Sequence, residues 1–142
     1  MESSRIRVLI VEDFQPFRQF ISSQLQNRPA LQIISEVSDG LEAVQNAQNL
    51  QPDLVLLDIG LPTLNGIEVA RRIRQCAPMA KILFVSENRS PDIAEEALAT
   101  GAGGYVVKSD AASELLVAVD AVLQGMQFVA ASLADRFLVP AR

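Results

Sequence analysis

Short apolar runs alternate along this chain with segments whose apolar residues recur at helical spacing. The most uniform run covers residues 54–57 and leads directly into Asp58, with Gly60 and Pro62 just beyond it. A short run without alternation, bounded by turn residues, predicts a strand buried on both faces, as in a parallel sheet. Four further strands are predicted over residues 7–11, 31–37, 81–85 and 104–107. The segment 31–37 is less uniformly apolar, so we expect it nearer an edge of the sheet.

Helical periodicity fills the intervals between these strands. The expected helices cover residues 14–26, 41–50 and 66–76, a segment from Pro91 to a C-cap at Gly101, and a last segment that ends near Gln124. The side chains expected to cap helix starts are Asn65, Ser90, and either Ser109 or Asp110. A strand followed by a helix, repeated five times, predicts an α/β domain with a doubly wound, five-stranded parallel sheet and right-handed crossovers.

The C-terminal residues fall outside this pattern. We expect one domain over residues 1–125, which suits the usual size of a domain. Residues 126–142 are then a C-terminal extension or the start of a linker, in which residues 132–138 form either a short helix or the beginning of that linker.

Composition narrows the chemistry that this domain can perform. The 142 residues include no His and a single Cys, Cys76, and the net charge is −5. The absence of His excludes Ser-His-Asp and Cys-His catalysis and most zinc sites. The acidic balance argues against direct nucleic-acid binding by this segment. Because the chain also shows no signal-peptide core, no run of membrane-spanning length and no possible internal disulfide, we expect a cytoplasmic protein without membrane contact.

Polar groups follow four of the predicted strands and should meet at one edge of the sheet. They are Glu12 and Asp13, Asp58, Ser86, and Lys108. The carboxyl ends of parallel strands form the edge where ligands bind in open α/β sheets. Three acids placed together raise one another's pKa, which Lys108 and a hard cation would relieve. Mg²⁺ suits such a site because it takes carboxylate oxygens and shares phosphate oxygens.

Asp58 is the best candidate nucleophile, since it leaves the middle of the sheet as a single carboxylate. A carboxylate can accept a phosphoryl group to give an aspartyl phosphate, a transfer that depends mainly on positioning and charge neutralisation. In this hypothesis Mg²⁺ bridges Asp58 and one phosphoryl oxygen. Lys108 pairs with a second oxygen, and the Ser86 hydroxyl donates to a third.

The segments that carry these groups resemble a known family. They are Val-Leu-Ile-Val-Glu-Asp at 8–13, Asp-Ile-Gly-Leu-Pro at 58–62, Asn-Gly-Ile-Glu at 65–68 and Gly-Ala-Gly-Gly-Tyr-Val-Val-Lys at 101–108. Together they are similar to receiver domains of bacterial two-component response regulators, over about residues 6–125. The resemblance implies a flavodoxin-like (CheY-like) fold with strand order 2-1-3-4-5. The Lys108-Ser109 junction, with residues 128–137 behind it, resembles receivers of the NarL/FixJ (LuxR-type) subfamily.

The resemblance also implies roles for residues. Asp58 would be phosphorylated by a sensor histidine kinase, and Asp13, Asp58 and the Gly60 carbonyl would hold Mg²⁺, with Glu12 acting through water. Ser86 and Tyr105 would form a switch pair, in which the hydroxyl moves to the phosphoryl group and the ring turns inward. The chain would then be a phosphorylation-activated switch and not a turnover enzyme. It would control transcription through a C-terminal DNA-binding domain absent from these residues, with a homodimer as a further possible partner.

Three positions depart from the family pattern. Glu12 stands where Asp is commoner, and Ser109 follows Lys108 where many relatives have Pro, which leaves open whether that peptide bond is cis or trans. Glu87 follows Ser86 where a small residue is usual. Its carboxylate could obstruct or repel phosphodonors, or slow hydrolysis of the phosphoryl group.

Two rival functions make different predictions. An aspartyl phosphatase of the haloacid dehalogenase kind carries a second Asp two residues after its nucleophile, where this chain has Gly60. A stand-alone or phosphorylation-independent interaction module would keep its spectra unchanged when acetyl phosphate or beryllofluoride is added with Mg²⁺. No phosphate-binding loop of the nucleotide-binding type occurs in the chain.

Overall fold

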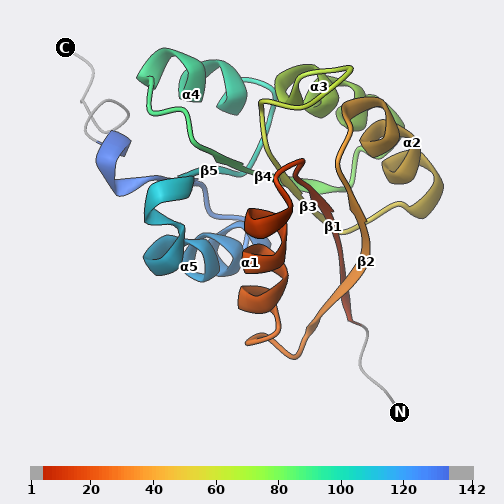
Figure 1. The fold of residues 1–142 in the computed structure, drawn as a ribbon, viewed down its shortest axis with the longest axis horizontal. Helices are drawn as coiled ribbons and strands as arrows, with labels where there is room; N and C mark the ends of the chain where they lie inside the picture. Colours follow the sequence, from red (N-terminus) through yellow and green to blue (C-terminus); the bar gives the residue numbers. More distant parts are fainter. Residues whose placement is uncertain (1–4, 135–142) are drawn as a thin grey trace.

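A parallel sheet forms the centre of the molecule, and the computed structural model describes residues 5–134 of it (Figure 1). The strands are β1 (Ile6–Val11), β2 (Leu31–Val37), β3 (Leu54–Leu57), β4 (Lys81–Ser86), β5 (Gly104–Val107) and β6 (Phe128–Val129). Their order across the sheet is β2-β1-β3-β4-β5-β6, and every neighbouring pair is parallel. The predicted order 2-1-3-4-5 is confirmed, and a short sixth strand is added beside β5. The less apolar strand β2 lies at the edge, as its sequence indicated.

Helices cover both faces of this sheet (Figure 1). They are α1 (Gln15–Leu25), α2 (Gly40–Leu50), α3 (Gly66–Cys76), α4 (Pro91–Leu98) and α5 (Ala111–Leu123), with short 3-10 helices η1 (Lys108–Asp110) and η2 (Ala131–Leu133). α1 and α5 lie on one face, while α2, α3 and α4 lie on the other. The strands are apolar on both faces because each face is buried under helices, which divides the core into two clusters.

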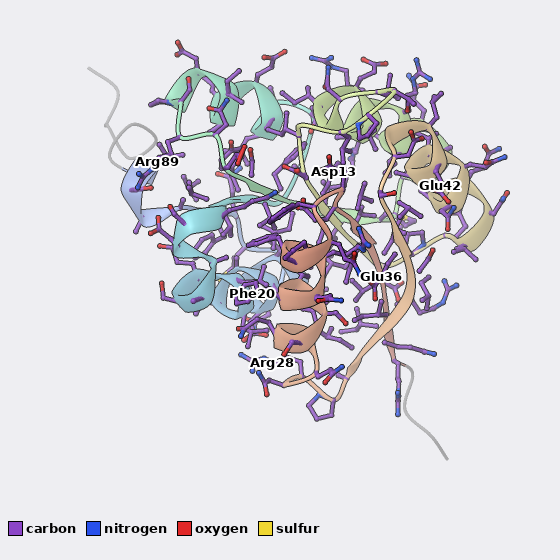
Figure 2. All side chains as sticks on the ribbon, viewed as in Figure 1. Asp13, Phe20, Arg28, Glu36, Glu42 and Arg89 are labelled. Carbon is purple, nitrogen blue, oxygen red and sulfur yellow. The ribbon has the colours of Figure 1, made fainter. Side chains whose placement is uncertain are left out.

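α1 and α5 are neighbours on their face of the sheet. Phe20 points from α1 towards α5 (Figure 2), and its ring lies 5.4 Å from that of Phe17. At the end of α1, Arg28 forms an ion pair with Asp120 of α5 at 2.7 Å. The Arg28–Asp120 ion pair therefore joins α1 to α5 near the amino ends of the strands.

Local capping explains most helix starts. The Asn65 side chain accepts hydrogen bonds from the backbone N–H groups of Ile67 and Glu68 at 2.9 and 3.1 Å, as predicted. Ser90 caps α4 as predicted, by accepting from the N–H of Ile93. The prediction of a side-chain cap on α5 was wrong, because Asp110 makes no such bond. The 3-10 helix η1 leads into α5 instead, and its backbone accepts the first N–H of the helix.

The predicted C-cap of α4 at Gly101 was wrong. The helix ends at Leu98 with Ala99 as its C-cap, and Gly101 follows two residues later with φ +95°. A left-handed φ of this kind is easily adopted only by glycine. Gly101 therefore turns the chain towards β5 and does not cap the helix itself.

The segment after α5 joins the sheet. β6 pairs with β5, and the Ala130 N–H donates to the Tyr105 carbonyl at 2.8 Å. Ala130 and Leu133 are buried in the same cluster as residues of α4. The predicted short helix at 132–138 lies mostly outside the described residues. Within residues 5–134, no helix is long and apolar enough to cross a membrane.

Candidate functional site

Four strands carry charged and hydroxyl side chains to the carboxyl edge of the sheet. Lys108, just after β5, places its Nζ 2.9 Å from Glu12 Oε2 and 3.2 Å from Asp58 Oδ2. These partners lie 96 and 50 residues away in the sequence. The structure therefore brings together the acids and the lysine that the sequence placed at separate strand ends.

Asp58 is a buried carboxylate at the end of β3, with 6% of its surface exposed. Its Oδ1 accepts a hydrogen bond from the backbone N–H of Ile59 at 2.8 Å, and its Oδ2 faces Lys108. Burial raises the pKa of Asp58 above its ordinary value, and the nearby charge of Asp13 raises it further. Lys108 and the Ile59 N–H oppose this rise without cancelling it. The charged form of Asp58 is therefore less stable here than in water, and a bound cation would stabilise it.

Glu12 is buried more deeply than Asp58, at 1% exposure. Its Oε2 accepts from Lys108 and from the Phe14 N–H at 3.1 Å, whereas its Oε1 has no hydrogen-bond partner among the described residues. Burial, followed by the charge of Asp58, raises the pKa of Glu12. A buried acceptor without a partner is unusual and leaves a free ligand atom at the site.

Lys108 balances the two buried acids. Burial lowers its pKa, but the hydrogen bond that Lys108 donates to Glu12 and the charge of Asp58 outweigh burial, so the pKa is raised overall. Its Nζ also lies 4.8 Å from the centroid of the Phe17 ring, a cation–π distance. The ammonium group is thus held in place by three neighbours and remains charged at neutral pH.

The acids also form a set of possible metal ligands. Glu12, Asp13 and Asp58 each offer an oxygen, and these atoms lie within 4.8 Å of one another. Asp13 is exposed at the end of β1, where the chain turns into α1 (Figure 2). Oxygen-only ligands with one side open to water suit Mg²⁺, and the unpartnered Glu12 Oε1 fits a site that a cation completes. The donor set is therefore compatible with the expected ion.

A cavity of about 600 Å³ opens above these groups. Its lining residues are Asp13, Phe14, Phe17, Asp58, Ile59, Gly60, Ser86, Glu87, Asn88 and Lys108. Every predicted site residue lines the cavity except Glu12 and Tyr105, which are deeply buried. The exposed side chain of Glu87 lines it as well.

Ser86 and Tyr105 meet through the backbone of Asn88. Ser86 Oγ accepts from the Asn88 N–H at 3.1 Å, and the Tyr105 hydroxyl donates to the Asn88 carbonyl at 2.8 Å. The Tyr105 ring already lies inward, with no exposed surface, and burial raises the pKa of its phenol. Asn88 was not identified from the sequence, because it contributes here through its backbone, which leaves no signal in residue type.

Two further features of the site were not predicted. Gly66, at the start of α3, has no room for a Cβ, which would collide with the Asp58 carbonyl. The glycine of the Asn65-Gly66 pair is the sequence signal that could have indicated this close approach. The Lys108–Ser109 peptide bond, left open by the sequence, is trans.

Comparison with known proteins identifies the family of this chain. The family model described as response regulator receiver domain matches residues 8–120. The transcriptional regulatory protein DegU of Brevibacillus brevis is 32% identical over 91% of this chain and 55% of its own length. The transcriptional regulatory protein LnrK of Bacillus subtilis is 35% identical over 84% of this chain and 54% of its own. The chain therefore spans about half the length of the curated relatives it matches.

Solved structures agree with the sequence matches. A two-component response regulator of the LuxR family from Aurantimonas sp. has a TM-score of 0.87 and 32% identity, covering 93% of this chain and 94% of that one. The response regulator domain of Thermotoga maritima CheB has a TM-score of 0.77 and 30% identity, covering 84% and 97%. On these matches, the chain belongs to the response regulator receiver domain family and is of the LuxR type.

Proposed function

We propose that this domain is a phosphorylation-activated switch that accepts a phosphoryl group on Asp58 from a sensor histidine kinase, with Mg²⁺ as cofactor. One observation carries the proposal. Asp58 is a buried carboxylate held 3.2 Å from a lysine ammonium, at the floor of an open cavity that also exposes Asp13. Structural ion pairs do not need such a cavity, whereas a phosphoacceptor does.

The residues of the site have distinct roles in this proposal. An Asp58 carboxylate oxygen attacks phosphorus, the P–N bond of the donor phosphohistidine breaks, and its electron pair returns to the imidazole. Lys108 pairs with the phosphoryl oxygens, and the Ser86 hydroxyl donates to one of them. Asp13, Asp58, the Gly60 carbonyl and, through water, Glu12 would hold Mg²⁺, which would supply positive charge beside the transferring group. The buried carboxylate becomes an acyl phosphate, a mixed anhydride whose charge lies on the phosphoryl oxygens.

Ser86 and Tyr105 connect this chemistry to the surface. A phosphoryl group adds roughly −1.5 to −2 charges if it resembles other phosphorylated side chains. If Ser86 Oγ turns towards it, its bond with the Asn88 N–H at 3.1 Å is lost. The Tyr105 hydroxyl holds the same Asn88 backbone, so the β4–α4 loop and α4 would shift together. The faces of α4 and α5 are the surfaces on which partners would sense this change.

The proposal also covers the output of this switch. We propose transcriptional control through a C-terminal DNA-binding domain, supported by the names of the curated relatives, which are transcriptional regulators about twice as long. The relatives are named as regulators and not as enzymes, which supports a phosphoacceptor without turnover. A cytoplasmic location and a possible homodimer belong to the same proposal, and they rest on family membership.

The test is phosphate incorporation with Mg²⁺ and phosphoramidate, a small phosphodonor. Intact-protein mass spectrometry should show one added phosphoryl group that hydroxylamine removes, as expected for an acyl phosphate. Asp58→Asn should abolish the addition, and Asp53→Asn, at the opposite end of β3, should retain it. Labelling that survives Asp58→Asn refutes the assignment.

A second readout uses the single Tyr of this Trp-free chain. Beryllofluoride with Mg²⁺ should change the intrinsic fluorescence of Tyr105 in the wild type and leave Asp58→Asn unchanged. Unchanged fluorescence in the wild type favours a phosphorylation-independent interaction module.

A further inference from the structure

Glu87 is a carboxylate at the rim of the phosphoacceptor cavity that the proposed chemistry does not use. Its side chain is exposed and lines the cavity together with Asp58 and Lys108. It makes no hydrogen bond or ion pair with another residue between 5 and 134. The nearest arginine in sequence, Arg89, lies well apart from Asp13 in the view of Figure 2. Within the described part of the chain, the charge of Glu87 is therefore uncompensated.

The other charged side chains at the cavity sum to zero once a divalent cation is bound. Lys108 is the only cation that lines the cavity among the described residues. Its ammonium is already shared between Glu12 and Asp58. A divalent cation would bring Glu12, Asp13, Asp58 and Lys108 together to neutrality. The net charge that an incoming donor meets is then that of Glu87.

We propose that Glu87 is a specificity-determining residue that selects against small, free, anionic phosphodonors, an inference that rests on the proposed phosphorylation of Asp58. Acetyl phosphate is a dianion at neutral pH and must approach Asp58 past this carboxylate. A protein donor meets the same repulsion but gains contacts outside the cavity that offset it. Glu87 therefore reduces phosphorylation by metabolites more than phosphorylation by a docked partner.

The reaction tested is simple. An Asp58 oxygen forms a bond to phosphorus, the P–O bond to the acetyl group breaks, and acetate leaves with the electron pair. Glu87 takes no part in this exchange, so its effect is on donor approach. Repulsion between a unit charge and a dianion across a partly hydrated cavity corresponds to roughly a tenfold change in rate.

The experiment compares the full chain with Glu87→Gln, which keeps the size of the side chain and removes its charge. The rate of Asp58 phosphorylation by acetyl phosphate is measured at Mg²⁺ concentrations that saturate each protein, at about 0.1 M and about 1 M ionic strength. We expect Glu87→Gln to react roughly tenfold faster at low salt and to converge on the wild type at high salt, where charges are screened. Phosphoramidate, with its protonated nitrogen and lower net charge, should show a smaller gain.

Glu95→Gln is the matched control. Glu95 is an exposed carboxylate on α4 that does not line the cavity, so its rates should equal those of the wild type. Equal rates for the wild type and Glu87→Gln, or a slower Glu87→Gln, overturn the inference while leaving Asp58 phosphorylation intact. A gain that is the same for both donors and at both salt concentrations also overturns it, since the effect is then not one of charge. No incorporation in either protein refutes the proposed function and this inference together.

Discussion

Replacing Lys108 with Met tests how the buried acids are held in the folded protein. Met is nearly as long as Lys but carries no charge, so Lys108→Met removes the ammonium that lies 2.9 Å from Glu12 and 3.2 Å from Asp58. Glu12, with 1% of its surface exposed, then has no cationic partner. Removing one partner of a buried ion pair typically costs about 3–5 kcal/mol, because the other charge remains buried and unpaired.

Protonation of Glu12 limits the free energy of unfolding that the substitution can remove. An unpaired Glu12 can always become protonated, which costs about 1.4 kcal/mol for each pH unit above its ordinary pKa of 4.5. At about pH 7.5 this ceiling is about 4 kcal/mol, and at about pH 5 it is under about 1 kcal/mol. We therefore expect Lys108→Met to lower the free energy of unfolding by about 3 kcal/mol at pH 7.5 and by less than about 1 kcal/mol at pH 5.

The sign of this pH dependence follows from the direction of the pKa shifts. The pKa values of Glu12 and Asp58 are raised in the folded state, mainly by burial. Their charged forms therefore reduce stability above the folded pKa, and the reduction disappears as pH falls and the folded state takes up protons. The Lys108 pKa is also raised, so its stabilising charge is fully present below its ordinary value and is lost only in strong alkali. Of these three groups, only Glu12 and Asp58 contribute to the slope of stability against pH between pH 5 and 8.

Urea unfolding followed by circular dichroism at the two pH values measures the effect. Lys81→Met is the control, since Lys81 is an exposed lysine at the start of β4, away from the acids. In a Glu12→Gln background, Lys108→Met should cost clearly less than in the wild type, because the buried Glu12 charge is already gone. An equal loss at pH 5 and pH 7.5, or an unchanged loss in the Glu12→Gln background, would refute the reasoning.

Three other substitutions test separate parts of the structure by the same urea assay. Asp58→Asn should raise the free energy of unfolding at about pH 7.5 and lose this gain as pH falls towards 4, because it removes a buried charge whose pKa is raised; a loss of stability at pH 7.5 contradicts this. Gly66→Ala should destabilise by about 3 kcal/mol, since its Cβ would meet the Asp58 carbonyl, whereas Gly60→Ala has open space and should cost far less. Leu133→Ala should cost about 2 kcal/mol because Leu133 is 6% exposed in the core; wild-type stability would show that η2 does not pack in solution.

The five main strands and the polar residues that follow them could be predicted from the amino-acid sequence. The continuous apolar runs of β1, β3, β4 and β5 are buried on both faces, and such runs form parallel strands with their carboxyl ends on one edge. Asp58 and Lys108 follow two of these runs directly, so their convergence could be predicted without coordinates. Asn65 is a similar case, because capping depends only on a side chain and the helix that follows it.

The contacts between these groups became known from the folded structure. The sequence does not show that Glu12 reaches Lys108 while one of its oxygens has no partner, since this depends on side-chain geometry between β1 and β5. The link from Ser86 to Tyr105 runs through the backbone N–H and carbonyl of Asn88, which any residue except proline would supply. β6 is two residues long and forms because the edge of β5 is free to accept it. Such long-range pairing leaves no local pattern of polar and apolar residues, so no reading of the chain alone could have found it.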